Sequence, residues 1–298
     1  MAFNPTVIEK GLRAGFGRSM AEFQAARAIN PGLLRAAMRV PSNGAYEKLG
    51  WVGAMPSVTQ WLGERNAKQF ESYDYTVRNL DWQTSVPISE NDINDDQTAA
   101  LSMIPQMLAQ RIMVHPERLM VDLLTGGTSG LAYDGVAFFS DVSGARTIDN
   151  LLDGTGTSLA QIEADLDAAL VAMAKFTDDQ GEVMNFRGDL IVCPVAMERK
   201  FRRLVQSMTD PTATAVGTFN PYNGLTVIGD PRLDGTDAND WYLLATNEIV
   251  KPLIYQIRQG AQASMEKTNH TKSWVFGADY RGNGAYGLPH LAVKTVNT

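Results

Sequence analysis

Apolar residues recur every three or four positions near the N-terminus, as they do along one face of an amphipathic helix. The stripe consists of Ile8, Leu12, Phe16, Met20 and Phe23. Such a stripe is stable only when it packs against another surface. The turn-forming run Asn30-Pro31-Gly32 ends this helix, and we expect a second short helix over Leu33–Arg39.

A longer helical pattern begins at the acidic run 91–96, because carboxylates at a helix start cap free N–H groups and complement the helix dipole. Its apolar stripe is Leu101, Ile104, Leu108 and Ile112. Pro105 predicts a kink or a division of this helix. His115-Pro116 predicts a second interruption, after which the helix resumes over Glu117–Leu124.

The clearest helical pattern covers Leu159–Phe176, where Ser158 and Gln161 form the capping box that marks a helix start. Another helix is predicted over 195–208 and carries the basic patch Arg199-Lys200-x-Arg202-Arg203. A basic patch is compatible with nucleic-acid binding. Because the body around it is acidic, the sequence favours a solvated or an intersubunit face.

Alternation of apolar and polar residues predicts strands over Tyr73–Val77 and Leu80–Ile88, which together indicate a long β-arm running into a sheet. Leu190–Cys193 is typical of a buried strand. Further strands are expected at 225–229, 241–245, 252–257, 273–279 and 289–296. Residues 42–66 show no sustained period, and Trp51 and Trp61 in this long loop favour a partner-binding surface.

The chain has 298 residues, 44% of them hydrophobic and 20% charged, as in an ordinary globular protein of about two domains. Residues 1–50 hold seven cations and three anions, a net charge of +4. Because the whole chain has a net charge of −7, residues 51–298 carry a net charge of −11. A basic arm on an acidic body indicates contact with an acidic partner, another copy or nucleic acid, or else a solvated face.

No apolar run approaches the ~18 residues of a membrane helix. Cys193 is the single cysteine, which excludes an internal disulfide and favours a reducing site of synthesis.

Residues that carry catalysis are nearly absent from the sequence. His115, His270 and His290 have no metal-binding spacing. The run from Asp92 lacks the glycine and the glutamate that a calcium loop requires at its sixth and twelfth positions. The sequence therefore predicts no catalytic site, no metal and no cofactor, with a hydrolase using the acidic cluster Asp92, Asp95 and Asp96 kept as a minor alternative.

Several segments carry a more specific signal: Trp61–Arg65, Tyr73–Asn79, Val86–Ile88, Asn91–Gln97 and Tyr133–Ser140. Together they resemble the major capsid protein of tailed bacteriophages and, more narrowly, the Mu-like prophage major head subunit family. The resemblance implies an α+β fold with an N-terminal arm, an extended β-loop, a peripheral domain with a long spine helix, and an axial domain. We expect these units at 1–43, 44–82, 83–184 with 248–298, and 185–247.

The family further implies a structural protein, not an enzyme, that forms pentamers and hexamers of an icosahedral shell around packaged double-stranded DNA held by non-specific contact. The implied partners are a separate scaffolding protein, a maturation protease and a portal, with a decoration protein left open and no membrane. The protein would be made in the bacterial host cytoplasm and reside in the virion. An encapsulin-like nanocompartment shell is the alternative.

The resemblance also implies three sets of contact residues. The intersubunit loop would use Trp51, Trp61, Glu64, Arg65 and Lys68. The basic arm would face inward or bind a neighbour's acidic body through Arg13, Arg18, Arg27, Arg35 and Arg39. The peripheral tip, which meets other copies near three-fold positions, would include Glu266, Lys267 and Lys272. Covalent cross-linking between Lys68 and Asn269 is not expected.

Overall fold

The computed structural model describes residues 5–29, 31–52, 72–95, 103–141, 146, 148–178, 181–209, 211, 219–235, 238–268 and 272–297. Its helices are α1 (Pro5–Ile29), α2 (Glu90–Asp95), α3 (Ile104–Thr125), α4 (Leu159–Lys175) and α5 (Val195–Gln206), with short 3-10 helices at Gly32–Ala36, Gly126–Thr128 and Pro289–Leu291. Its strands are β1 (Ala37–Pro41), β2 (Tyr46–Val52), β3 (Ser72–Arg78), β4 (Leu80–Ser89), β5 (Leu151–Asp153), β6 (Leu190–Cys193), β7 (Thr226–Gly229), β8 (Trp241–Leu244), β9 (Leu253–Thr268), β10 (Ser273–Tyr286) and β11 (Ala292–Val296).

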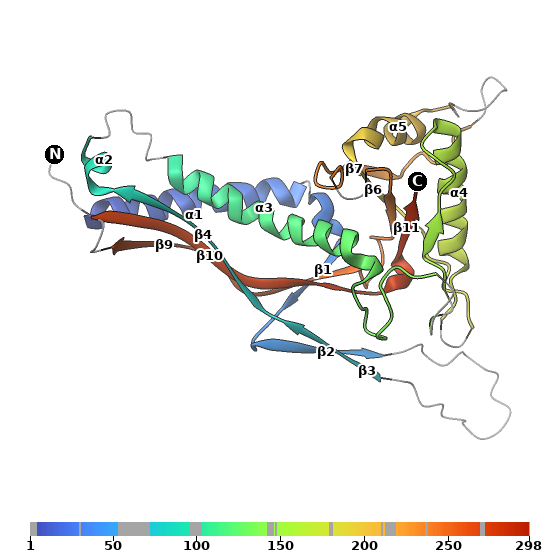
Figure 1. The fold of residues 1–298 in the computed structure, drawn as a ribbon, viewed down its shortest axis with the longest axis horizontal. Helices are drawn as coiled ribbons and strands as arrows, with labels where there is room; N and C mark the ends of the chain where they lie inside the picture. Colours follow the sequence, from blue (N-terminus) through green and yellow to red (C-terminus); the bar gives the residue numbers. More distant parts are fainter. Residues whose placement is uncertain are drawn as a thin grey trace.

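A long four-stranded sheet has the strand order β1-β9-β10-β4. β9 and β10 form an antiparallel hairpin, β4 pairs antiparallel with β10, and β1 joins β9 in parallel. Helices α1 and α3 lie side by side along this sheet (Figure 1). On β4 the predicted alternation holds in part: Trp82 contacts His115 of α3 and Ile88 belongs to the buried core, whereas Leu80 and Val86 are each 38% exposed.

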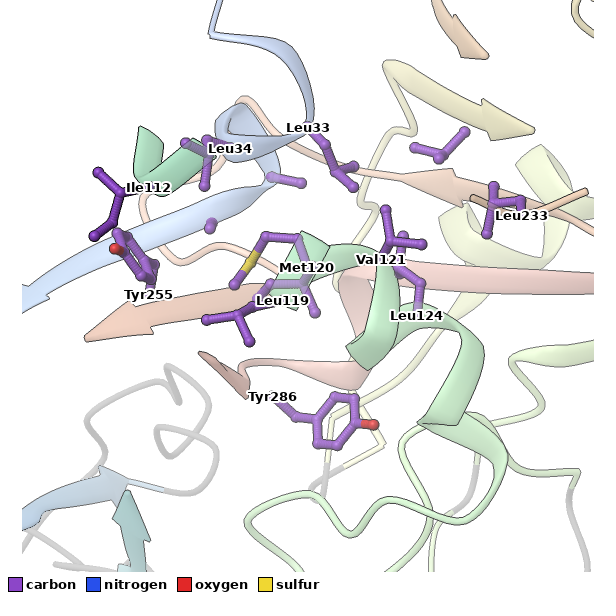
Figure 2. Close-up of a cluster of buried hydrophobic side chains, with 14 of the residues drawn as sticks. Leu33, Leu34, Ile112, Leu119, Met120, Val121, Leu124, Leu233, Tyr255 and Tyr286 are labelled. Carbon is purple, nitrogen blue, oxygen red and sulfur yellow. The ribbon is translucent and has the colours of Figure 1, made fainter. Parts of the chain in front are cut away.

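The N-terminal stripe packs against this core where its side chains are described. Phe16 of α1 is buried, and Met20 is packed beside it. Figure 2 shows Leu119, Met120 and Leu124 of α3 in one cluster with Leu33 and Leu34 of the first 3-10 helix. The segment that follows α1 is therefore fixed to the body through apolar contacts.

The two expected interruptions have different outcomes: α3 begins at Ile104, immediately before Pro105, so a new helix starts where a division was expected, whereas the interruption expected at His115-Pro116 is wrong. Pro105 lies in the first turn of the helix, where a missing N–H removes no hydrogen bond. Pro116 lies inside the helix, and α3 continues through it to Thr125. An internal proline costs about 3 kcal/mol, which the burial of flanking side chains such as Ile112 and Met120 offsets.

Two local expectations fail because tertiary pairing decides them. The helix expected at Leu33–Arg39 is a 3-10 helix that ends at Ala36, after which β1 pairs with β9. Part of the aperiodic stretch 42–66 forms β2, which pairs with β3 from Tyr46 opposite Arg78 to Val52 opposite Ser72. In both cases the partner strand is distant in sequence, so the local pattern of residues does not predict the pairing.

The second sheet has five strands in the order β5-β11-β8-β6-β7. Its central strands are buried on both faces. Leu190 and Val192 of β6 face the core under α3, whereas Ile191 and Cys193 face a second core with α4 and α5. A strand covered on both faces shows a continuous apolar run rather than alternation, which explains the sequence of β6.

Helices α4 and α5 cover the outer face of this sheet. The predicted capping box is present, with the Ser158 hydroxyl accepting from the Gln161 N–H and the Gln161 side chain accepting from the Ser158 N–H. Phe201 of α5 packs edge-on against Trp241 of β8 at 5.2 Å between ring centroids. α4 and β11 thus share a core with residues 190–245, whereas the family layout expects them in the peripheral domain.

Candidate assembly surfaces

Residues that carry catalysis elsewhere have structural roles here. Cys193 is buried, and loss of hydration raises the pKa of its thiol to about 12. His290 is 5% exposed. Within the described ranges no three His, Cys, Asp or Glu side chains gather as metal ligands would. In the acidic cluster Asp92 is exposed, whereas the side chain of Asp95 and all of Asp96 lie outside the described residues.

An open groove of about 940 Å³ runs between α3 and β4. His115 Nδ1 lies 2.6 Å from the Tyr280 hydroxyl within it, and the His115 ring packs on Trp82 at 4.4 Å between centroids. Burial, reinforced by Arg118, lowers the pKa of His115, so the imidazole is neutral at pH 7. Burial also raises the pKa of the Tyr280 hydroxyl, so it stays protonated, and the His115–Tyr280 hydrogen bond joins α3 to β10.

The arginines of the predicted basic arm separate into two groups. Arg18 and Arg39 are exposed. Arg35 instead forms an ion pair within the chain, with its Nη2 at 2.6 Å from Asp189 Oδ2, and donates from Nε to the Thr246 hydroxyl at 3.0 Å. Arg35 is therefore occupied by the chain's own five-stranded sheet, which differs from the expected contact with a neighbour. The side chains of Arg13 and Arg27 lie outside the described part.

The β2–β3 ribbon projects away from the body (Figure 1). Its base is held by Val77, which is buried with Ile254 and Ala285, and by Tyr75, whose hydroxyl accepts from the Tyr286 N–H at 3.3 Å. Trp51 lies on β2 opposite Tyr73, but its side chain is outside the described residues. Trp61, Glu64, Arg65 and Lys68 are also outside them, so the intersubunit loop stays a prediction.

The turn between β9 and β10 carries the predicted peripheral tip. Glu266 and Lys272 are exposed. Lys267 contacts Glu90 of α2 at 3.1 Å and lies 5.3 Å from the centroid of the Trp274 ring. The tip is thus connected to the start of α2, a contact that the sequence alone did not indicate.

The Tyr133–Ser140 segment has a buried organising residue that sequence reasoning missed. Arg146 is 7% exposed and donates to both carboxylate oxygens of Asp134 at 2.8 Å. It also donates to the carbonyls of Ala137 and Phe138. The signal in the sequence is a lone arginine shortly after an aspartate in a glycine-rich stretch, which is too common to be diagnostic.

Comparison with solved structures defines the class of protein. The chain superimposes on the procapsid protein of bacteriophage JBD30 with a TM-score of 0.54 at 22% identity, covering 99% of this chain and 77% of that chain. The fold is thus that of tailed-phage major capsid proteins. An encapsulin from Synechococcus elongatus PCC 7942 shares it as well, with a TM-score of 0.56 at 13% identity over 89% of this chain and 86% of that chain.

Sequence comparison gives the family. The model of the Mu-like prophage major head subunit gpT matches residues 9–162 and 226–298, and the chain belongs to this family. It is 24% identical to the Mu-like prophage FluMu major head subunit of Haemophilus influenzae, over 96% of this chain and 72% of that protein. It is 30% identical to the major capsid protein of Escherichia phage Mu, over 42% of this chain and 40% of that protein.

Family membership makes this chain a structural capsid protein of the virion, as the resemblance predicted. It favours the phage head over the encapsulin-like alternative, whose likeness is confined to the fold. Among the described residues no helix is long and apolar enough to span a membrane.

Proposed function

We propose that copies of this chain form pentamers and hexamers that close an icosahedral shell around packaged double-stranded DNA. The chain acts as a building block and not as an enzyme, and it is synthesised in the cytoplasm of the bacterial host. A separate scaffolding protein, a maturation protease and a portal act with it, and DNA is held through phosphate charge without sequence readout. Membership of the head subunit family supports this function.

The observation that carries the proposal is the projecting β2–β3 ribbon. A two-stranded ribbon is marginally stable by itself in water, and among the described side chains the apolar anchors of this one are Leu49, Tyr75 and Val77, which pack on the body. A neighbouring copy that lies under the ribbon would supply the missing packing. Many such modest contacts, made together, stabilise a shell through multivalency.

We propose that residues 1–43 form the N-terminal arm and that residues 44–82 form the extended loop. The body divides into a peripheral unit around α3, β9 and β10 and an axial unit around 185–247. Because α4, β5 and β11 pack with the second core, we propose that they move with the axial unit even though they lie outside 185–247. Exposed apolar side chains at Met208 and Phe219, 84% and 75% exposed, support contacts at the tip of this unit.

Electron microscopy of the purified chain, with and without its scaffolding protein, tests the proposal directly. Closed particles with five- and six-fold capsomers are expected, whereas a monodisperse monomer under all assembly conditions would overturn it. Trp61→Ala should lower particle yield while leaving the thermal unfolding of the unassembled chain unchanged. A normal particle yield from this variant would show that Trp61 of the loop does not contribute to the contact between copies.

The packaged content separates the phage head from a nanocompartment. Particles from cells that produce the whole head should contain nuclease-protected double-stranded DNA. A protein cargo with no nucleic acid would instead favour the encapsulin-like alternative.

A further inference from the structure

The groove between α3 and β4 has an exposed stripe of side chains along its helical wall. Met107, Arg111, Val114 and Arg118 all line it. They follow one another at steps of four, three and four residues, so they share one face of α3. All four are exposed, with Met107 at 65% and Val114 at 39%. Apolar and basic side chains therefore alternate along a helix face that the described part of the chain leaves open.

The other wall of the groove is formed by an edge strand. β4 is the last strand of the four-stranded sheet, and in the described part of the chain β10 is the one strand that pairs with it. It is ten residues long, and its residues Trp82, Gln83 and Thr84 line the groove. An edge of this kind presents a row of main-chain N–H and C=O groups that is a template for a further strand.

The groove is basic, although the chain as a whole has a net charge of −7. Its charged lining is Arg111, Arg118 and Arg232 against Asp122. Arg232 is engaged, with its Nε at 2.9 Å from Asp230. Arg118 lies 3.9 Å from Asp122, with side chains 67% and 62% exposed, and such a pair contributes at most about 1 kcal/mol. Arg111 and Arg118 can therefore bind an incoming carboxylate at little cost.

We propose that this groove binds an extended segment of a separate protein that carries acidic and apolar side chains on one face. The segment adds to the edge of β4 through main-chain hydrogen bonds, the mode of recognition known as β-augmentation. Side chains two residues apart on a strand share a face. The carboxylates of that face bind Arg111 and Arg118, and its apolar side chains cover Met107 and Val114.

The chemistry of the groove favours this partner over two others. A second copy paired edge to edge brings β4 itself, whose single carboxylate, Asp81, is already paired with Arg281 at 2.9 Å. DNA phosphates suit arginines, but they gain nothing from Met107 and Val114 in the same groove. A segment with both acidic and apolar side chains uses both kinds of side chain in the stripe. The inference goes beyond shell formation and does not depend on it.

A fluorescein-labelled peptide of three Val-Thr-Glu-Thr repeats tests the proposal on the unassembled chain. In a strand this repeat places valine and glutamate on one face and threonine on the other. Saturable binding is expected in fluorescence anisotropy, and it should weaken as the salt concentration rises, because salt screens exposed charges. Absence of binding at low salt would overturn the proposal.

Charge reversal locates the binding site. Arg111→Glu combined with Arg118→Glu should lower the affinity for this peptide at least tenfold. The matched control, Arg199→Glu with Arg203→Glu, makes the same change in net charge at exposed arginines of α5 and should leave the affinity within twofold. Circular dichroism should be the same for both double variants, because all four positions are exposed. Equal affinities in the two double variants would show that the peptide does not bind in this groove.

Two N-methylated forms of the peptide test the main-chain pairing. The N–H groups of alternate residues point to the same edge of a strand. Methylation of the valines and glutamates therefore blocks one edge, and methylation of the threonines blocks the other. One form should bind within threefold of the parent peptide and the other at least tenfold more weakly. If the two forms bind equally, the segment does not add to β4 as a strand.

Competition experiments identify the class of partner. A peptide with serine in place of valine should bind at least tenfold more weakly than the parent peptide, and a twelve-base-pair DNA duplex should not displace the parent. Equal binding of the serine peptide, or displacement by DNA, would mean that the groove recognises negative charge alone and would refute the proposal. Because binding is measured on the unassembled chain, these outcomes are independent of capsomer formation.

Discussion

Arg35, which follows the N-terminal helix, donates through Nη2 to the carboxylate of Asp189 at 2.6 Å, and the two residues join the arm to the five-stranded sheet. Arg35 also donates to the hydroxyls of Thr246 and Thr226 at 3.0 and 3.1 Å. Asp189 accepts the Thr246 hydroxyl at 2.6 Å. The arm is thus held to the body by a closed polar network as well as by apolar packing.

Asp189→Ala is expected to lower the free energy of unfolding by about 1–3 kcal/mol, because it leaves a half-buried guanidinium and a buried threonine without their acceptor. Urea denaturation of the unassembled chain measures this loss. Asp74→Ala is the matched control, since Asp74 and Lys48 form an exposed pair at 3.8 Å that contributes at most about 1 kcal/mol. Equal losses in the two variants would contradict the network's role.

Arg146→Ala should destabilise the chain more strongly, by about 3–5 kcal/mol, because it leaves the Asp134 carboxylate without its buried partner. Arg146→Lys should recover only part of this, because an ammonium lacks the planar fork that reaches Asp134 and two carbonyls at once. Arg118→Ala, which breaks the exposed pair with Asp122, is the control and should cost under about 0.5 kcal/mol. Full recovery by lysine would show that charge alone is sufficient.

The lowered pKa of His115 predicts a pH dependence of stability. Burial disfavours the imidazolium in the folded state, so below pH ~6.5 the unfolded chain binds more protons than the folded chain. The contribution of His115 is therefore fully present above that pH and falls as the pH drops. Melting temperatures at pH 7.5 and 5.5 should differ less for His115→Gln than for the unmodified chain, and an unchanged difference would contradict this.

Cys193 should resist alkylation while the chain is folded. Its pKa of about 12 leaves almost no thiolate at pH 8, and its side chain is fully buried. Iodoacetamide should label it only upon denaturation, as followed by mass spectrometry. A cysteine introduced by Met208→Cys, at a position 84% exposed, is the positive control, and equally fast labelling of Cys193 in the folded chain would refute its burial.

Local patterns predicted the elements whose stabilising contacts are close in sequence. The Ser158–Gln161 capping box marks the start of α4 because both partners lie within one turn. The alternation in Leu80–Ile88 predicts β4 because Trp82, Thr84 and Ile88 on one face are more buried than the polar residues between them. Pro105 marks the start of α3, whereas Pro116 was misinterpreted as an interruption because the burial that offsets an internal proline is not visible in the local sequence.

The candidate surfaces were predicted less completely than the elements. Arg35 and Arg18 look equivalent in the sequence, yet only Arg35 meets an acidic partner on the distant sheet. The basic patch of α5 was recognised, but only the structure separates Lys200 and Arg202, which are engaged, from Arg199 and Arg203. Contacts made on folding, such as Arg35 with Asp189 and Lys200 with Thr157, decide which charged side chains are engaged, and a count of charges in the sequence does not contain this information.

The sequence by itself determined most helices, most strands and the family, because periodicity, capping and characteristic segments each depend on residues that are close together in the chain. Only the tertiary structure decided that β1 joins β9, that β2 pairs with β3, and that α4 and β11 share the core of the second sheet. These pairings connect residues far apart in the chain, and their free energy comes from surfaces that exist only after the chain has folded.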